Sequence, residues 1–345
     1  MTTQSARRHC RACFARPRLL TCFARLRLTS FARPGLPTSF ARPGLPTSFA
    51  RLARLVLTAL VAALTIATAS AQSPRTPRIV SLVPSLTETL FAIGAGTSVV
   101  GVGTFDNFPP EVTKLPRVGA LLDPDVERIL SLKPDLVVTY GSQTALEAQL
   151  ARANIRTYSY RHGGIADVFE SIKGVGRASS HAVEADALVS RLTSQLDALR
   201  ARVKGRPRPK TLLVVDRQPG TLREIYASGG IGFLHDMLEA AGGDNVFADV
   251  KKESVQPSTE TLLTRGPQVI LEVRAEGLIQ PGAVAAERNV WATLAGVPAV
   301  RNGRIHFLSG SHLVVPGPRL IQGAEDFARV LHPELFTPGN GAPGR

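Results

Sequence analysis

The chain has 345 residues, of which 44% are hydrophobic, and it carries a formal net charge of +14. This length allows two domains with substantial hydrophobic cores. Residues 1–71 contain eleven Arg and neither Lys nor acidic residues, so eleven of the fourteen excess positive charges lie there and +3 is left for the rest of the chain. Because the remainder is close to neutral, we expect no nucleic-acid partner.

The first 71 residues form a leader of unusual composition. Residues 30–38 (SFARPGLPT) repeat as residues 39–47. Repeats rich in Arg, Pro and Gly cannot build a packed core, so we expect this region to be disordered. All three cysteines, Cys10, Cys13 and Cys22, lie in the leader, and the remaining chain therefore has no disulfide or thiol chemistry.

The leader ends in a pattern that is typical of a secretory signal peptide. Arg51 and Arg54 precede an apolar run over residues 55–67, which is followed by the small residues Ala69-Ser70-Ala71. We expect cleavage near Ala71, a mature chain that begins near Gln72, and a periplasmic location. No cysteine follows the apolar run, so we expect no lipid anchor.

Downstream, apolar runs of strand length alternate with stretches of helical periodicity. The expected strands cover residues 78–83, 99–102, 136–139, 156–158, 211–215, 269–272 and 304–308. The expected helices cover residues 87–93, 125–132, 144–153, 167–177, 232–241, 259–264 and 318–331. Val-, Ile- and Leu-rich strands that alternate with helices predict an α/β fold with parallel sheets covered on both faces.

The longest predicted helix covers residues 179–204, and Gly205, Pro207 and Pro209 follow it and end it. Its apolar residues recur at steps of three and four and form one stripe. They are Ala185, Leu188, Val189, Leu192, Leu196, Leu199 and Val203. Since α/β units precede and follow this helix, we expect it to join two lobes with a ligand crevice between them, beyond the carboxyl ends of the strands. The alternative is an ordinary crossover helix inside one sheet.

The two halves of the chain also resemble each other. Residues 127–138 (ERILSLKPDLVV) match residues 260–271 (ETLLTRGPQVIL) without a gap. In each, a Glu opens a helix, a Pro follows seven residues later, and an aliphatic strand comes next. We interpret this register as pseudo-symmetry between two lobes, against the alternative that similar α/β units match by chance.

Five short motifs occur in one order along the chain. They are residues 78–88 (RIVSLVPSLTE), 99–110, 126–137, 238–246 (LEAAGGDNV) and 291–305. In these motifs the chain resembles the periplasmic substrate-binding proteins of ABC importers for cobalamin and for ferric siderophores or haem. The resemblance covers about residues 78–333. It implies two open parallel-sheet α/β lobes joined by one long backbone helix, with the ligand cleft between the lobes and no catalytic role.

The resemblance and the patterns above predict a division of the chain. The expected segments are a leader over 1–71, a short linker over 72–77, an N-terminal lobe over 78–178, the inter-lobe helix over 179–205, a C-terminal lobe over 206–336 and a disordered tail over 337–345. We expect a monomer whose partner is an ABC permease dimer in the inner membrane.

In the family, each lobe presents one surface Glu to an arginine cluster on the permease. The matching residues here are Glu127 and Glu260. Two like charges on equivalent lobe surfaces suit a partner that has its own two-fold axis. The alternative for each residue is an acid that meets the dipole of its helix, an interaction of about 0.3–1 kcal/mol.

The expected ligand is a metal chelate, held by residues at the strand ends and in the loops that follow. The candidates are Pro84, Phe105, Asp106, Tyr140, Arg161, Arg217, Arg274, His312 and Arg319. Aromatic rings pack against a large flat ligand, and arginines bind carboxylate or catecholate oxygens bidentately. We expect no resident cofactor, because the cobalt or iron belongs to the ligand.

The identity of the chelate stays open between a corrinoid and a ferric siderophore or haem. Cobalamin binders often place tryptophans at the cleft rim, where this chain has Leu121 and Tyr140. The single tryptophan, Trp291, lies in a segment that we interpret as core packing. This departure favours a siderophore or haem over cobalamin.

Two other functions are possible from the sequence. One is a secreted chelatase-like enzyme that acts on tetrapyrroles with His312 or His235 as the base. The other is a binding protein for free zinc or manganese, although the histidines show no ligand spacing such as His-x-x-x-His.

Overall fold

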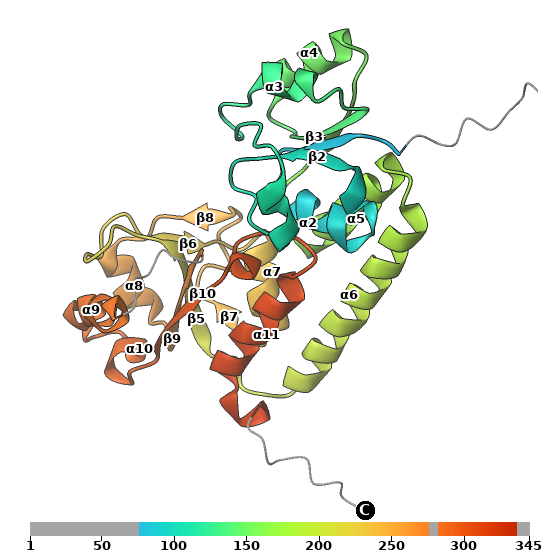
Figure 1. Ribbon diagram of the computed structural model, residues 1–345. Coiled ribbons are helices and arrows are strands. Elements are labelled where there is room, and N and C mark those ends of the chain that lie inside the picture. Colours follow the sequence, from blue (N-terminus) through green and yellow to red (C-terminus); the bar gives the residue numbers. More distant parts are fainter. Residues whose placement is uncertain (1–75, 276–281, 337–345) are drawn as a thin grey trace, which may run out of the picture. The chain divides into compact units, whose positions relative to one another are not determined.

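The structure is a computed structural model that describes residues 76–275 and 282–336 (Figure 1). The predicted signal peptide, the leader repeats and the tail over 337–345 lie outside the described residues. The described residues all belong to one compact unit. In the described part of the chain, no helix is long and apolar enough to cross a lipid bilayer.

The first sheet has four strands, all parallel, in the order β2-β1-β3-β4. The strands are β1 (Ile79–Ser81), β2 (Val99–Val102), β3 (Leu136–Tyr140) and β4 (Arg156–Tyr160). The central strands β1 and β3 are buried along nearly their whole length, which explains why their sequences are continuous aliphatic runs. The four parallel strands predicted for this part of the chain are confirmed.

Helices and short 3-10 turns connect these strands, and together with the sheet they form the first lobe. They are α2 (Pro84–Ala92), η1 (Ala95–Ser98), η2 (Pro110–Lys114), α3 (Val126–Ser131), α4 (Thr144–Arg152) and α5 (Ile165–Ala178). The first of these begins three residues earlier than predicted. Pro84 occupies its first turn, where proline is favoured because its missing N–H would have no partner anyway.

The second sheet has six strands, in the order β10-β9-β5-β6-β8, with β7 also paired to β5. The strands are β5 (Lys210–Asp216), β6 (Tyr226–Ser228), β7 (Asp244–Asn245), β8 (Ser254–Val255), β9 (Val269–Arg274) and β10 (Ile305–Ser309). The pairs β5–β9 and β9–β10 are parallel, as predicted, and the two-residue strand β7, which was not predicted, also pairs with β5 in parallel. By contrast, β6 and β8 add an antiparallel edge that was not predicted. They are too short to show a strand periodicity.

The second lobe consists of this sheet and the helices that follow α6. They are α7 (Phe233–Ala240), α8 (Thr259–Arg265), α9 (Ala283–Val290), η3 (Trp291–Leu294), α10 (Pro298–Arg301), η4 (Ser311–Leu313), α11 (Leu320–Leu331) and η5 (Pro333–Leu335). Trp291 is fully buried in a core cluster of this lobe, which confirms its predicted packing role.

The internal repeat corresponds to equivalent units of the two lobes. In the first lobe α3 leads into β3, and in the second lobe α8 leads into β9. Each helix has a side-chain N-cap, because Asp125 accepts from the Arg128 N–H at 2.9 Å and Ser258 accepts from the Thr261 N–H at 3.2 Å. The strand order β2-β1-β3-β4 of the first sheet is matched by β7-β5-β9-β10 in the second.

Helix α6 (Ala182–Val203) is 22 residues long. It begins three residues later than predicted because Ser180, in the connection from α5, adopts a positive φ of 66° that no helix can accommodate. Its buried residues are the predicted stripe: Ala185, Leu188, Val189, Leu192, Leu196, Leu199 and Val203.

Two separate sheets lie on either side of α6 in the sequence, so the alternative of a crossover helix inside one sheet is wrong. The helix contacts α5 of the first lobe and both α7 and α11 of the second (Figure 1). One hydrophobic core includes its stripe together with residues of all three helices. The helix therefore connects the lobes through a shared core and is not a free-standing strut.

Candidate functional site

A pocket of about 280 Å³ lies where the strand ends of the first lobe meet a segment of the second lobe. Its first-lobe wall is formed by residues that follow β1, by the last residues of β3 and β4, and by His162 just after β4, at the carboxyl edge of the parallel sheet. Its second-lobe wall is the segment 314–316, between η4 and α11. The lining residues are Val83, Pro84, Ser85, Tyr140, Tyr160, His162, Val314, Val315 and Pro316. The carboxyl edge of such a sheet is the usual place for a ligand.

Aromatic and imidazole rings form a continuous row along this pocket. Tyr140 and Tyr160 meet edge to face with ring centroids 6.1 Å apart, and His162 meets Tyr160 in the same way at 6.1 Å. The row continues into the second lobe, where the ring of Phe233 lies 5.7 Å from that of His162. The Tyr160 hydroxyl and His162 Nδ1 are 3.1 Å apart and share a hydrogen bond.

Burial makes both pocket tyrosines harder to ionise than a free phenol, which is already neutral at physiological pH. It raises the pKa of Tyr140 to about 12, and the nearby Asp106 carboxylate adds to the rise. Burial likewise raises the pKa of Tyr160. Both hydroxyl groups are therefore hydrogen-bond donors at physiological pH, and either can become a phenolate only if a cation or metal replaces the proton.

An ion pair beside the pocket bridges the two lobes. Arg319, at the start of α11, donates from Nε and Nη2 to the two carboxylate oxygens of Glu88 in α2, at 2.9 and 2.5 Å. Its Nη2 also donates to Ser311 Oγ at 2.9 Å, and its guanidinium lies 3.8 Å from the ring centroid of Phe108. We call this group of Glu88, Phe108, Ser311 and Arg319 the inter-lobe clamp.

The clamp carboxylate is deeply buried. Glu88 is only 5% exposed, and this burial raises its pKa while the hydrogen bonds and charge of Arg319 offset part of the rise. A bidentate arginine–carboxylate pair of this kind fixes the orientation of both groups. Arg319 was predicted to contact the ligand, but here its guanidinium is committed to Glu88.

Asp106 is a buried acid without a hydrogen-bond partner among the described residues. The residue is 1% exposed, and neither of its carboxylate oxygens has a partner there. Burial raises its pKa to about 7, and the proximity of Thr87 and Arg117 lowers it only in part. Asp106 was predicted to contact the ligand; it lies in the loop after β2 and is not among the residues that line the pocket.

Further lobe-to-lobe contacts lie near the pocket. The Ile165 N–H, at the start of α5, donates to the Asp236 carboxylate of α7 at 2.8 Å. His162 Nε2 lies 3.6 Å from a carboxylate oxygen of Glu253. Together with the clamp, these contacts hold the two walls of the pocket against each other.

Arg217 and Arg274, which were predicted to contact the ligand, form ion pairs inside the second lobe. Both bind the buried carboxylate of Glu272, Arg217 through Nε and Arg274 through Nη2, each at 3.0 Å. Arg217 also pairs with Glu287 at 2.7 Å, and its side chain is 1% exposed. Trp291 Nε1 donates to Glu272 at 2.6 Å. These arginines neutralise a buried acid inside the second lobe, and neither is among the residues that line the pocket.

The other predicted site residues have different environments. Pro84 and Tyr140 line the pocket. His312 is bound to Asp326 of α11, with Nε2 and the carboxylate 2.8 Å apart. Phe105 and Arg161 are exposed in the loops after β2 and β4. The acids Glu127 and Glu260 are also exposed, each in the first turn of its helix.

Tyr160, His162 and the segment 314–316 were not among the predicted contacts. The first two come directly at and after the end of β4, so strand-end position was the signal that could have identified them. The segment 314–316 has no periodicity or charge that separates it from other loops. No group of three or more His, Cys, Asp or Glu that could hold a metal ion is found within residues 76–275 and 282–336.

Two α/β lobes joined through a long buried helix, with a pocket at the strand ends where they meet, define a solute-binding protein of the helical-backbone type. The model of the periplasmic binding protein family matches residues 79–311, and the chain belongs to this family. It is a transport binding protein and not an enzyme, so the chelatase-like alternative is wrong.

Known proteins similar to the chain agree with this assignment. An uncharacterized ABC transporter substrate-binding lipoprotein of Bacillus subtilis, YvrC, is 32% identical over 75% of this chain and 81% of its own length. The vitamin B12-binding protein of Salmonella typhimurium is 28% identical over 74% of this chain and 90% of its own length. The structure of the periplasmic heme-binding protein RhuT from Roseiflexus sp. RS-1 superposes with a TM-score of 0.65 at 26% identity, covering 75% of this chain and 99% of that one.

Proposed function

We propose that this protein captures a metal chelate, a haem, ferric siderophore or corrinoid, between its lobes and delivers it to the permease of an ABC importer. The observation that carries the proposal is the row of Tyr140, Tyr160 and His162 along the pocket. Rings of this kind pack against a flat macrocycle, and both Tyr and His serve as axial ligands of haem iron. The chelate is cargo, so the protein needs no resident cofactor.

The names of similar proteins support a metal chelate as the ligand but do not determine which chelate it is. The Salmonella protein is named for vitamin B12 and the Roseiflexus protein for heme. The pocket has no tryptophan at its rim, and its two tyrosines and one histidine can supply a phenolate or an imidazole to iron. We therefore propose haem or a ferric siderophore as the first candidate and cobalamin as the second.

The pocket must widen to hold such a ligand. Its volume of about 280 Å³ lies just below the range of about 300–1,000 Å³ that is usual for small-molecule sites, and a tetrapyrrole is large for that range. The lobes share one core through α5, α6, α7 and α11. We therefore propose a modest separation of the lobes, by a few degrees, in place of a wide hinge motion.

Docking on the permease is proposed to use Glu127 and Glu260. Both acids are exposed and stand at the start of equivalent helices, α3 and α8. Complementary charge steers association and sets orientation more than it adds affinity. The pair would thus orient the two lobes on a two-fold symmetric partner.

The ligand can be tested by titrating the purified protein with haem, a ferric siderophore and cobalamin, and recording visible absorption and thermal stability. We expect one chelate to raise the melting temperature of the protein, and we expect the absorption bands of that chelate to shift on binding. Tyr140→Phe or Tyr160→Phe should weaken binding about tenfold or more, if the phenol binds the metal or its chelating group.

Tyr158→Phe is the matched control, because Tyr158 lies on β4 two residues from Tyr160 but its hydroxyl donates to the Ser171 carbonyl at 3.3 Å, away from the pocket. It should leave chelate binding unchanged. If none of the three chelates binds, or if all three tyrosine variants weaken binding equally, the proposed site is wrong.

A further inference from the structure

A second cavity lies at the other end of the second-lobe sheet, where its strands begin. It has a volume of about 830 Å³. Gln268 and Arg304 line it and immediately precede β9 and β10, and Arg208 precedes β5. The chelate pocket lies instead beside the carboxyl ends of strands, so this cavity is not part of the transport site described above.

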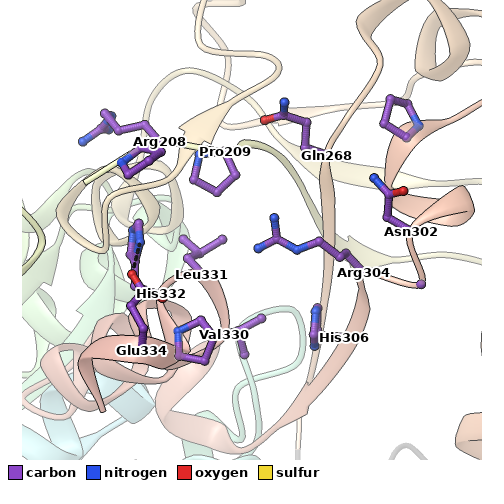
Figure 2. Close-up of a pocket in the computed structure, with 14 residues that line it drawn as sticks. Arg208, Pro209, Gln268, Asn302, Arg304, His306, Val330, Leu331, His332 and Glu334 are labelled. Carbon is purple, nitrogen blue, oxygen red and sulfur yellow. Dashed lines mark ion pairs between the residues drawn. The ribbon is translucent and has the colours of Figure 1, made fainter. Parts of the chain in front are cut away.

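Positive and hydrogen-bond-donating groups dominate this cavity. Arg304 extends into it (Figure 2). The residue is half-buried, and its guanidinium makes no hydrogen bond or ion pair with any residue that the structure describes. A half-buried guanidinium without a counter-charge retains its full capacity to bind an anion.

The groups around Arg304 reinforce this preference. Gln268 accepts the Lys210 N–H through Oε1 at 2.9 Å, which leaves its amide NH₂ to donate into the cavity. His306 is half-buried, and burial, followed by the charges of Arg304 and Arg288, lowers its pKa. It is therefore a neutral imidazole that can donate one hydrogen bond. Asn302 adds a second amide (Figure 2).

Little negative charge opposes these groups. The only carboxylate that lines the cavity, among the described residues, is Glu334; it is half exposed and lies 3.9 Å from His332 Nδ1 (Figure 2). Arg208 has its own partner, because it donates to the Glu239 carboxylate and to the Gly243 carbonyl, each at 2.5 Å. Its position is thereby fixed at the cavity wall.

The walls of the cavity are rigid and partly apolar. Four of the lining residues are prolines, Pro207, Pro209, Pro298 and Pro333, and each fixes its own backbone φ. Val330 and Leu331, at the end of α11, give the cavity an apolar side. A preformed wall lowers the entropic cost of binding.

We propose that this cavity binds a small organic oxyanion, a molecule with a phosphate or carboxylate group and a short carbon skeleton. Arg304 pairs with the oxyanion, and Gln268 and His306 donate to its remaining oxygens. Val330 and Leu331 contact the carbon skeleton. The oxyanion is either a soluble metabolite or the headgroup of an anionic lipid, and these two sources share the chemistry that the cavity recognises.

The test is titration calorimetry of the purified full chain with citrate, inorganic phosphate and glycerol 3-phosphate, each against sodium chloride of equal ionic strength. We expect at least one oxyanion to bind at a single site. Arg304→Gln should weaken that binding at least about tenfold, and Arg304→Lys should weaken it less. The matched control is Arg301→Gln, because Arg301 is exposed on α10 and does not line the cavity.

Flotation with vesicles of phosphatidylcholine, with and without phosphatidylglycerol, separates the two sources. Binding to anionic vesicles that Arg304→Gln abolishes and Arg301→Gln spares would support the proposal with a lipid headgroup as ligand. An equal loss of binding in Arg304→Gln and Arg301→Gln, in either assay, would show that the binding is general charge attraction. That result would overturn the proposal. The absence of binding to every soluble oxyanion and to the anionic vesicles would overturn it as well.

A fold control is needed for the key variant. Since the Arg304 guanidinium has no described partner, Arg304→Gln should unfold at the same temperature as the unchanged protein in chloride. His306→Gln, which keeps a donor, provides a second probe and should weaken oxyanion binding by a smaller factor. If both variants are stable and bind every probe as the unchanged protein does, the cavity is not an oxyanion site.

Discussion

At the scale of single residues, the candidate site is distinguished by acids that the fold buries beside the pocket. Glu88 is buried and has Arg319 as its partner, whereas Asp106 is buried and has no hydrogen-bond partner among the described residues. Burying an ionised carboxylate without a partner is costly, so the group takes up a proton instead. This is why the pKa of Asp106 rises to about 7.

Asp106 should therefore make the stability of the protein depend on pH. Because the pKa of Asp106 is higher in the folded state than in the unfolded state, the folded state binds more protons between pH 4 and pH 7. The contribution of Asp106 to the free energy of unfolding is most favourable below pH 4. It falls as the pH rises toward 7, and above pH 7 it no longer changes with pH. A pKa rise from 3.8 to about 7 corresponds to a loss of about 4 kcal/mol.

Urea unfolding at several pH values between 4 and 8 measures this effect. The Asn side chain cannot ionise. The free energy of unfolding of Asp106→Asn should therefore increase relative to that of the unchanged protein as the pH rises. Asp123→Asn, at an exposed position between η2 and α3, serves as the control, and its free energy of unfolding should follow the same pH dependence as that of the unchanged protein. A difference between Asp106→Asn and the unchanged protein that does not vary with pH would contradict the prediction.

At the scale of helices and strands, the sequence was informative wherever local periodicity decided the structure. The stripe from Ala185 to Val203 was predicted residue by residue, because a helix that buries one face must repeat its apolar residues every three or four positions. Strands β6, β7 and β8 were missed, since three, two and two residues are too few for any periodicity.

The site itself was less predictable, because it depends on contacts between distant parts of the chain. Glu272 lies within a strand run and gives no sign that it will bind Arg217, which is 55 residues away. The partner of Arg319 is 231 residues away in α2. Strand-end position indicated loops that border the pocket, but it could not tell which side chain would pair with a neighbour and which would face the pocket.

The inter-lobe clamp provides a prediction about the link between α2 and α11. Glu88→Gln leaves the partly buried Arg319 guanidinium, whose side chain is 16% exposed, without its counter-charge. Removal of one partner costs about 3–5 kcal/mol in a fully buried pair, so about 2–3 kcal/mol is expected here. We expect a loss of this size in urea unfolding. Hydrogen exchange should speed up in α2 and in the first turn of α11 together, because the clamp holds both.

An exposed ion pair in the second lobe supplies the comparison. Glu239→Gln removes the carboxylate partner of Arg208, which is 44% exposed, and should cost less than about 1 kcal/mol. In a double variant, Glu88→Gln with Arg319→Met should lose less stability than the sum of the two single changes. Additive losses, or faster exchange in α2 alone, would show that the clamp does not couple the lobes.

At the scale of the whole molecule, the two lobes are equivalent units that carry one exposed acid each. The repeat places Glu127 at the start of α3 and Glu260 at the start of α8, and each helix leads into a strand at the interior of its sheet. Neither acid makes a side-chain hydrogen bond or ion pair with the described residues, and the interaction of each with the dipole of its helix contributes only about 0.3–1 kcal/mol. Docking on a partner that contacts both lobes is the role proposed for the pair.

We expect the double variant Glu127→Arg with Glu260→Arg to abolish uptake of the chelate in cells that have the matching permease, while chelate affinity stays within about twofold of that of the unchanged protein. Charge reversal at both contacts turns steering and orientation into repulsion, whereas the chelate pocket contains neither residue. Each single variant should reduce uptake partially, because the other lobe still docks.

The control is Glu184→Arg with Asp186→Arg, an equal change of charge on the exposed face of α6, which should leave uptake intact. Equal loss of uptake in both double variants would attribute the effect to net charge, and undiminished uptake in the Glu127/Glu260 variant would remove these acids from the docking surface.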